Sequence, residues 1–119
     1  MTMKYMLMIY TDENCWSEGE RERCMETSKA ICHELQTKGQ FVSAAPLHPV
    51  SLATSVRVRN DRRVITDGPF AETVEQLGGY FVIDVANLDE ALAIAAACPG
   101  QKRGPSKCAR FSNSTACRN

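Results

Sequence analysis

Residues 80–85 read YFVIDV, a run in which five of six residues are β-branched or aromatic. Such runs are typical of strands that are buried in a sheet, so this segment predicts the central strand of the fold. Asn87 follows with Glu90 three residues later, a pattern typical of a helix start. Pro99 and Gly100 then stop the helix. Its expected apolar face comprises Leu88, Ala91, Leu92 and Ala95.

Two further elements are expected near the N-terminus. Residues 3–10, MKYMLMIY, are apolar and aromatic and predict a buried strand. Ser17 with Glu20 three residues on predicts the start of a helix that runs to about Lys38. Gly39 lies where a helix end favours a left-handed residue. The expected apolar face of this helix comprises Cys24, Met25, Ile31, Cys32 and Leu35.

A short strand and a hairpin are expected in the middle of the chain. Residues 40–45, QFVSAA, predict a strand that prolines 46 and 49 end. Residues 54–60 alternate valine with arginine, which indicates a half-exposed strand. Asn60-Asp61 favours a tight turn, after which residues 62–66 return as the second strand of the hairpin.

This order of elements favours an α+β fold with a ferredoxin-like split β-α-β sheet and an inserted hairpin. That sheet requires one more strand after the second helix, starting near residue 104. Residues 104–119, GPSKCARFSNSTACRN, are instead polar and show no alternation. We therefore expect the C-terminal strand to be lost or degraded. Residues 1–100 are interpreted as the domain, and residues 101–119 as an atypical tail.

The tail makes better structural sense in another reading frame. When each codon takes its first base from the preceding one, apolar and polar residues alternate largely regardless of codon choice. Thr-Val-Glu-Val-Arg-Pro-Ile-Phe is one allowed product, and it resembles the missing strand. We interpret the tail as a frameshift product; a natural basic, disordered tail is the alternative, and the nucleotide sequence tests the two.

The composition fits one globular domain of 119 residues and excludes collagen-like, low-complexity and disordered chains. The formal net charge of zero combines 9 basic and 14 acidic residues before position 101 with five basic residues after it. With the tail set aside, nothing supports nucleic-acid binding. No apolar run reaches the roughly 20 residues of a membrane helix. We expect a cytoplasmic protein with reduced cysteines and neither metal nor cofactor.

The most unusual stretch is DGPFAETVEQLGGY, residues 67–80. A carboxylate beside a Gly-Pro turn can act as a general base or hold a polar ligand, which makes Asp67 the candidate catalytic residue. A structural turn at Asp67 is the alternative interpretation. The predicted ligand-binding residues are Asp67, Gly68, Pro69, Phe70, Glu72, Tyr80 and His48. The alternatives are a solvated Glu72, a core or interface Tyr80 and an exposed His48 without a role.

These residues carry a resemblance to a known family. DGPFAETVEQLGGYFVIDV, together with KYMLMIYTDE near the start, resembles the DGPFAETKE group of the YCII-related proteins. Val74 departs from the lysine that is usual in the group. The resemblance implies a ferredoxin-like fold that pairs through its sheets as a dimeric α+β barrel, with a pocket between sheet and helices. Family members usually end in a strand much like Thr-Val-Glu-Val-Arg-Pro.

The resemblance also implies a range of functions. Some YCII-related proteins are regarded as lyase- or isomerase-type enzymes that use a His–Asp pair around the first helix. Aligned on Gly39, these two positions fall near Ser28 and Thr37, so the pair is not retained. We expect a homodimer that binds a small polar metabolite. Lyase- or isomerase-like activity is the catalytic form of this expectation. The alternative is a non-catalytic accessory or regulatory protein, because genes of the DGPF group often neighbour those of extracytoplasmic-function sigma factors.

Overall fold

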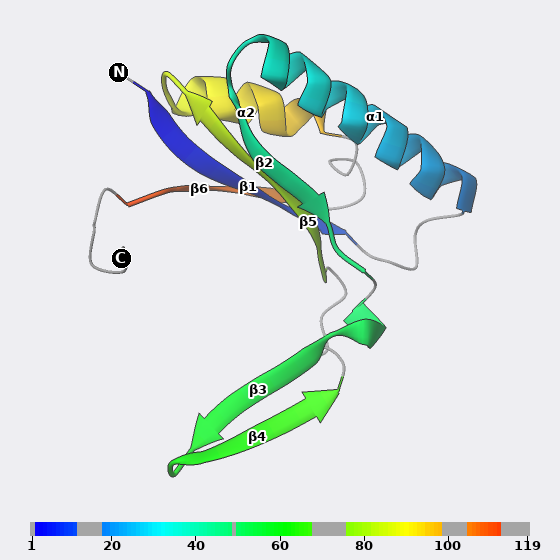
Figure 1. The fold of residues 1–119 in the computed structure, drawn as a ribbon, viewed down its shortest axis with the longest axis vertical. Helices are drawn as coiled ribbons and strands as arrows, with labels where there is room; N and C mark the ends of the chain where they lie inside the picture. Colours follow the sequence, from blue (N-terminus) through cyan, green and yellow to red (C-terminus); the bar gives the residue numbers. More distant parts are fainter. Residues whose placement is uncertain (1, 12–17, 49, 68–75, 99–104, 113–119) are drawn as a thin grey trace.

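The computed structural model describes residues 2–11, 18–48, 50–67, 76–98 and 105–112. Six strands and two α-helices lie within these ranges (Figure 1). In chain order they are β1 (Met3–Thr11), α1 (Glu18–Thr37), β2 (Phe41–Pro46), the short 3-10 helix η2 (Val50–Leu52), β3 (Thr54–Arg59), β4 (Arg62–Asp67), β5 (Gln76–Val85), α2 (Leu88–Ala97) and β6 (Ser106–Arg110).

Four of the strands form one antiparallel sheet in the order β2-β5-β1-β6. Both helices cover the same face of this sheet (Figure 1). β3 and β4 form a separate two-stranded sheet between β2 and β5 in the chain. This arrangement confirms the predicted α+β, ferredoxin-like fold with an inserted hairpin.

The core lies between the helices and the two central strands. Alternate side chains of β1 and β5 point toward the helices, because successive residues of a strand face opposite sides of a sheet. The buried side chains are Tyr5, Leu7, Leu35, Phe81, Ile83, Val85, Ala91, Ala95 and Cys98. The apolar face predicted for α2 is partly wrong. Leu88 and Leu92 remain 46% and 48% exposed, whereas Ile94 packs against the core.

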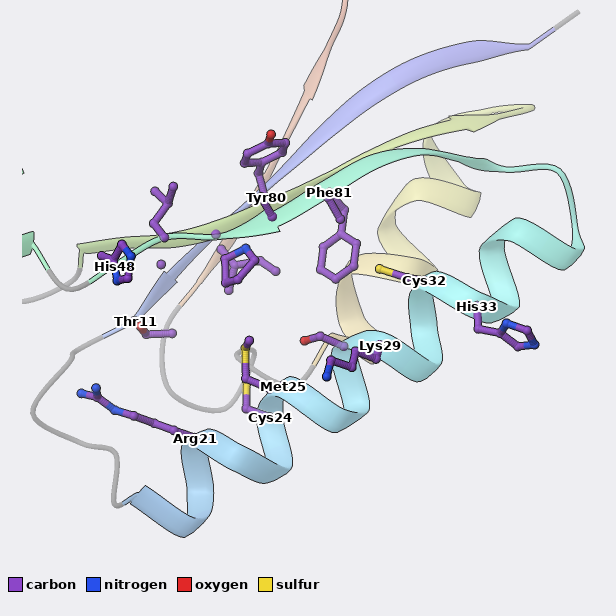
Figure 2. Close-up of a pocket in the computed structure, with 18 of the residues that line it drawn as sticks. Thr11, Arg21, Cys24, Met25, Lys29, Cys32, His33, His48, Tyr80 and Phe81 are labelled. Carbon is purple, nitrogen blue, oxygen red and sulfur yellow. The ribbon is translucent and has the colours of Figure 1, made fainter.

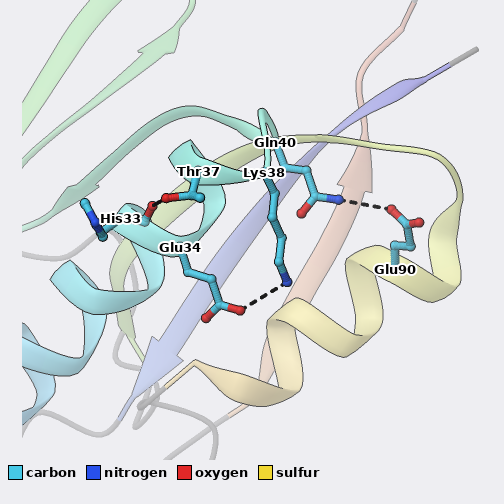
Figure 3. A network of polar contacts seen from close by, with 6 residues as sticks. All are labelled: His33, Glu34, Thr37, Lys38, Gln40 and Glu90. Atoms are coloured by element: carbon cyan, nitrogen blue, oxygen red, sulfur yellow. Dashed lines mark hydrogen bonds and ion pairs between the residues drawn. The ribbon is translucent and has the colours of Figure 1, made fainter.

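The N-terminus of α2 is fixed by the predicted pair of residues. The Asn87 side-chain oxygen accepts a hydrogen bond from the Glu90 backbone N–H at 3.0 Å. The Glu90 carboxylate in turn accepts bonds from the Ala86 backbone N–H at 3.2 Å and from the Gln40 side chain at 3.3 Å. Figure 3 shows the last of these bonds, which ties α2 to the segment just before β2. A helix cap thus also anchors a neighbouring strand.

The C-terminus of α1 ends in the predicted left-handed glycine. Gly39 has a φ of 71°, and its N–H donates to the carbonyl of Gln36 at 3.1 Å. The N–H of Gln40 reaches back to the carbonyl of Leu35 at 2.9 Å. This pair of bonds is the Schellman pattern, which satisfies carbonyls that a helix end leaves open. Ser17, the predicted start of α1, lies outside the described residues.

The hairpin turns at Asn60 and Asp61, as predicted, with φ values of 51° and 63°. Positive φ at both central residues is the geometry of a type I′ turn, which matches the twist of paired strands. The register mixes apolar and basic residues on both faces of the hairpin. One face presents Val56, Val58 and Ile65 with Arg63, and the other presents Arg57, Arg59 and Arg62 with Val64. Both faces are exposed within the described chain.

A strand forms at the C-terminal edge of the sheet, which corrects the expectation that it is lost. β6 pairs with β1 in antiparallel orientation, with Cys108 opposite Leu7. Flanking bonds join Tyr10 N–H to the Pro105 carbonyl at 3.0 Å and Phe111 N–H to the Lys4 carbonyl at 2.9 Å. The strand is short and lies at the edge of the sheet, with three of its five residues partly buried and Cys108 packed against the core. Backbone hydrogen bonds to the free edge of β1 are therefore enough to form this strand, although its sequence does not alternate apolar and polar side chains.

The face of the sheet opposite the helices combines apolar residues with the charged residues Lys4, Asp84 and Lys107. Met8 and Tyr80 are cross-strand partners on this face, and Val82 lies beside Met6. The Tyr10 hydroxyl donates to the Met8 sulfur at 3.8 Å. Small residues complete the face on both outer strands, namely Ala45 on β2 and Ala109 on β6. We refer to these seven residues as the open face.

Gly79 lies between Ile9 of β1 and Pro46 of β2. A Cβ at this position would meet the Ala45 carbonyl oxygen at 3.0 Å and the Pro46 Cα at 3.3 Å, both backbone atoms that yield poorly. At Gly78 the nearest atom would be the Thr11 hydroxyl oxygen at 3.3 Å, which can move by rotation. We expect Gly79→Ala to lower the free energy of unfolding by about 1–2 kcal/mol in urea denaturation.

Gly78→Ala is the matched control, and we expect it to stay within roughly 0.5 kcal/mol of the unmodified protein. Equal effects of the two substitutions would contradict the role assigned to Gly79.

The pKa of the Cys98 thiol is raised to about 11. Burial is the main cause, and the neighbouring thiols of Cys32, Cys108 and Cys24 contribute to the same increase. The unfolded chain therefore releases this proton first as the pH rises above 9. Stability that is fully present below that pH is then lost toward pH 11. Over this interval the unfolding free energy should fall by roughly 2 kcal/mol more in the unmodified protein than in Cys98→Ala. Parallel pH curves of the two proteins, measured by urea denaturation, would contradict this assignment.

Candidate functional site

A cavity of about 810 Å³ lies between α1 and the sheet (Figure 2). Strands β1, β2 and β5 contribute its second wall, and the chain after β2 contributes Leu47 and His48. This volume falls within the range of pockets that hold small molecules, which is roughly 300–1,000 Å³. The cavity is therefore the candidate site of this fold.

The wall on α1 is a stripe of residues at helical spacing. Arg21, Met25, Ser28, Cys32 and Gln36 recur every three or four positions and so share one face of the helix. Met25 is 43% exposed, although it belongs to the predicted apolar face. It faces the cavity instead of the core, which explains why an apolar side chain remains accessible. The full set from α1 is Arg21, Cys24, Met25, Ser28, Lys29, Cys32, His33 and Gln36.

The wall on the sheet combines small residues with a few larger apolar ones. Ala44 and Gly78 carry little or no side chain, so space remains above the strands. Phe81 points from β5 toward α1, and Ile9 contributes from β1 (Figure 2 shows Phe81). The side chains that face α1 are mainly apolar, as expected of a pocket that accepts the hydrocarbon part of a ligand.

Some polar groups lie at one end of the cavity, and others are spread along α1. Figure 2 shows Thr11, Arg21 and His48 toward the end where β2 leaves the sheet. Lys29 lies nearer the middle, below Phe81, whereas the ring of His33 is directed away from Phe81. No aspartate or glutamate is among the described residues that line the cavity. The fixed charges that the described lining residues supply are therefore cationic.

The thiols of the cavity are poor nucleophiles. Burial raises the pKa of Cys24 and outweighs a hydrogen bond with Ser28, which acts in the opposite direction. Burial also raises the pKa of Cys32. Nucleophilic attack requires the thiolate, which both shifts disfavour at neutral pH. Both cysteines are free thiols, in line with the expectation of reduced cysteines.

The predicted site residues are not brought together as one cluster in the described part of the chain. His48 and Tyr80 are both among the lining residues. The Tyr80 ring, however, lies on the side of the sheet away from α1 (Figure 2). Asp67 is exposed at the end of β4 and is not among the described lining residues. Gly68, Pro69, Phe70 and Glu72 lie outside the described residues.

Sequence reasoning missed the polar residues that α1 contributes. Arg21 and Lys29 look like ordinary solvated charges in the sequence, because most of their neighbours along the chain are polar. Their eight-residue separation leaves them about 80° apart around the helix, however, so both fit within one wide helix face. The signal that could have indicated a cavity is the presence of Arg21 and Lys29 on the same side of the helix as its apolar residues.

The two positions that replace the family's His–Asp pair have different surroundings. Ser28 lines the cavity. Thr37 does not line it, and its hydroxyl donates to the backbone carbonyl of His33 at 3.0 Å (Figure 3). Among the described residues, no three His, Cys, Asp or Glu side chains converge in a way that would hold a metal ion. None of the described helices has the length and apolar character needed to cross a membrane.

Comparisons with known proteins agree with this architecture. An uncharacterised protein of Rhizobium meliloti (strain 1021) is 40% identical over 96 residues, which cover 78% of this chain and 77% of that protein. The YCII-related domain matches residues 3–107, and so extends from β1 into β6. The resemblance inferred from the DGPFAETVEQLGGY stretch is thereby confirmed, and the chain belongs to the YCII-related domain family.

Proposed function

We propose that the protein binds a small polar metabolite in the cavity between α1 and the sheet. The observation that carries this proposal is the cavity itself, with about 810 Å³ of space, apolar walls and polar groups at one end and along α1. Apolar walls supply affinity, while a few placed polar groups orient the ligand. Ser28, at the position of the family's histidine, lies within this wall, which supports the cavity as the place where a ligand sits.

Lyase- or isomerase-like chemistry is the catalytic form of this proposal. Such reactions need a group that moves a proton at the substrate. His48 lies at the same end of the cavity as Thr11 and Arg21 in Figure 2. An imidazole can both accept and donate a proton, so His48 is our first choice for this role. Asp67 remains the second, at the start of the DGPF stretch.

The alternative function is a non-catalytic accessory protein that acts with a sigma factor. The exposed valines and isoleucine of the hairpin favour a protein partner, because exposed apolar surface often marks an interface. This observation does not identify the partner. Binding in the cavity is therefore preferred, since the cavity is defined by the fold and requires no second protein.

Filling the cavity tests the preferred function. Ser28→Phe places a large side chain into the space, and we expect it to weaken binding of the neutral fluorescent probe N-phenyl-1-naphthylamine at least tenfold in a fluorescence titration. Thr27→Phe is the matched control, because Thr27 is exposed on α1 and does not line the cavity. It adds the same ring outside the site and should leave the Kd within about twofold.

An unchanged Kd in Ser28→Phe, with a melting temperature near that of the unmodified protein, would show that the probe binds elsewhere and would overturn the proposal. Capture of a sigma factor by the immobilised protein would then favour the accessory function.

We also propose that two copies of the chain pair through the open face. Met8, Tyr80 and Val82 form its centre, where Met8 and Tyr80 remain partly exposed and Val82 is buried. A self-complementary apolar patch is the usual basis of a twofold dimer. Cytoplasmic location completes the proposal, in keeping with the free thiols of the described cysteines.

A charge on the open face tests the dimer. Met8→Lys would place cations near one another across the twofold axis, beside Lys107 of β6, which is the cross-strand partner of Met8. We expect a dimer for the unmodified protein and a folded monomer for Met8→Lys in sedimentation equilibrium at about 10 µM. Val56→Lys charges the hairpin instead and should remain dimeric. Dissociation by Val56→Lys alone would place the interface on the hairpin.

A further inference from the structure

The charged side chains that line the cavity in the described part of the chain have one sign. Arg21 and Lys29 are eight residues apart on α1, which corresponds to about 12 Å along the helix axis. Figure 2 shows Arg21 extending toward Thr11 and His48 at one end, and Lys29 lying beneath Phe81. The two cations are thus spread along one wall of the same space.

Carboxylates are kept out of that wall. The glutamates that flank the stripe on α1, Glu22 and Glu26, are exposed and do not line the cavity. Glu34 is paired with Lys38 at 3.1 Å, away from the lining residues (Figure 3). Within the described residues Lys29 has no ion-pair partner. A ligand that enters the cavity therefore meets the Lys29 cation, which no described lining residue neutralises.

The uncharged lining groups limit the ligand further. Thr11 and Ser28 offer hydroxyl groups, and the main bulk of the walls is apolar, with Ile9, Met25 and Phe81 as its larger members. A strongly hydrophilic ligand would lose its hydration against these walls without replacement. An apolar ligand without charge would leave Lys29 unused. The combination suits a molecule that has a hydrocarbon body and one anionic end.

We propose that the cavity selects a small organic carboxylate with an apolar body, and that Lys29 binds the carboxylate. This inference rests on the proposed function, because it names the ligand class of the same cavity. Arg21, at one end of the cavity, adds a weaker electrostatic attraction for the same anion and is not assigned a direct contact with the carboxylate. Lys29 and Arg21 are both largely exposed, so solvent and salt screen their charges. The preference for an anion is accordingly modest and declines with ionic strength.

Three probes of equal chain length test the charge. Octanoate, octanol and octylammonium are compared as competitors that displace N-phenyl-1-naphthylamine from the cavity. For the unmodified protein at 20 mM salt, octanoate should compete at roughly fivefold lower concentration than octanol, and octylammonium should be the weakest. At 500 mM salt the advantage of octanoate over octanol should shrink to less than twofold.

Lys29→Met removes the charge and keeps the length of the side chain. We expect it to abolish most of the advantage of octanoate and to leave octanol unchanged within twofold. Lys38→Met is the matched control, because it removes one cation from the end of the same helix without touching the cavity. Octanoate should bind to this variant as it binds to the unmodified protein. Arg21→Met should give an intermediate loss.

The outcomes separate this inference from the proposed function. Displacement that Ser28→Phe prevents, but in which octanol equals octanoate or Lys29→Met has no effect, would overturn the inference and leave metabolite binding intact. Equal losses in Lys29→Met and Lys38→Met would attribute the preference to net charge and would overturn it as well. Probe binding that is insensitive to Ser28→Phe would overturn the proposed function.

Discussion

The antiparallel pairing of β1 with β5 is the constraint on which the rest of the structure depends. It places Leu7 beside Phe81 and Tyr5 beside Ile83, so that one set of alternate side chains forms the floor beneath both helices. The other set, with Met8 beside Tyr80, forms the open face. A shift of one residue in this register would exchange the two sets. The core, the cavity and the proposed dimer surface are thus consequences of one pairing.

Much of the fold was predictable because its determinants are local. Gly39 ends α1, Asn60 and Asp61 turn the hairpin, and Asn87 caps α2, each through bonds that reach only a few residues along the chain. The run from Tyr80 to Val85 likewise indicates a buried strand by its composition. Helix faces were harder. Leu88 has the right spacing for the core and yet is half exposed, because the small residues Ala91 and Ala95 let α2 lie close to the sheet on another side.

The candidate site was less predictable, because its members come from distant parts of the chain. Of the predicted residues, His48 lies at the cavity, whereas Asp67 belongs to the hairpin end. The family motif draws attention to Asp67, but the space is bounded by α1, whose charged residues carry no motif. β6 was missed for a different reason. Its side chains do not alternate, and its position follows from the backbone groups that β1 leaves open at its outer edge.

The strand order also determines when each strand can find its partners during synthesis of the chain. β1 is the first strand to leave the ribosome, yet both of its partners, β5 and β6, are encoded in the last third of the described elements. Until Gln76–Val85 has been translated, Tyr5 and Leu7 have no sheet to join, and α1 has no floor on which to pack. Contacts of such long sequence separation slow folding, and a waiting apolar strand is exposed to aggregation. The nascent chain therefore carries β1 as an unpaired segment through most of its synthesis.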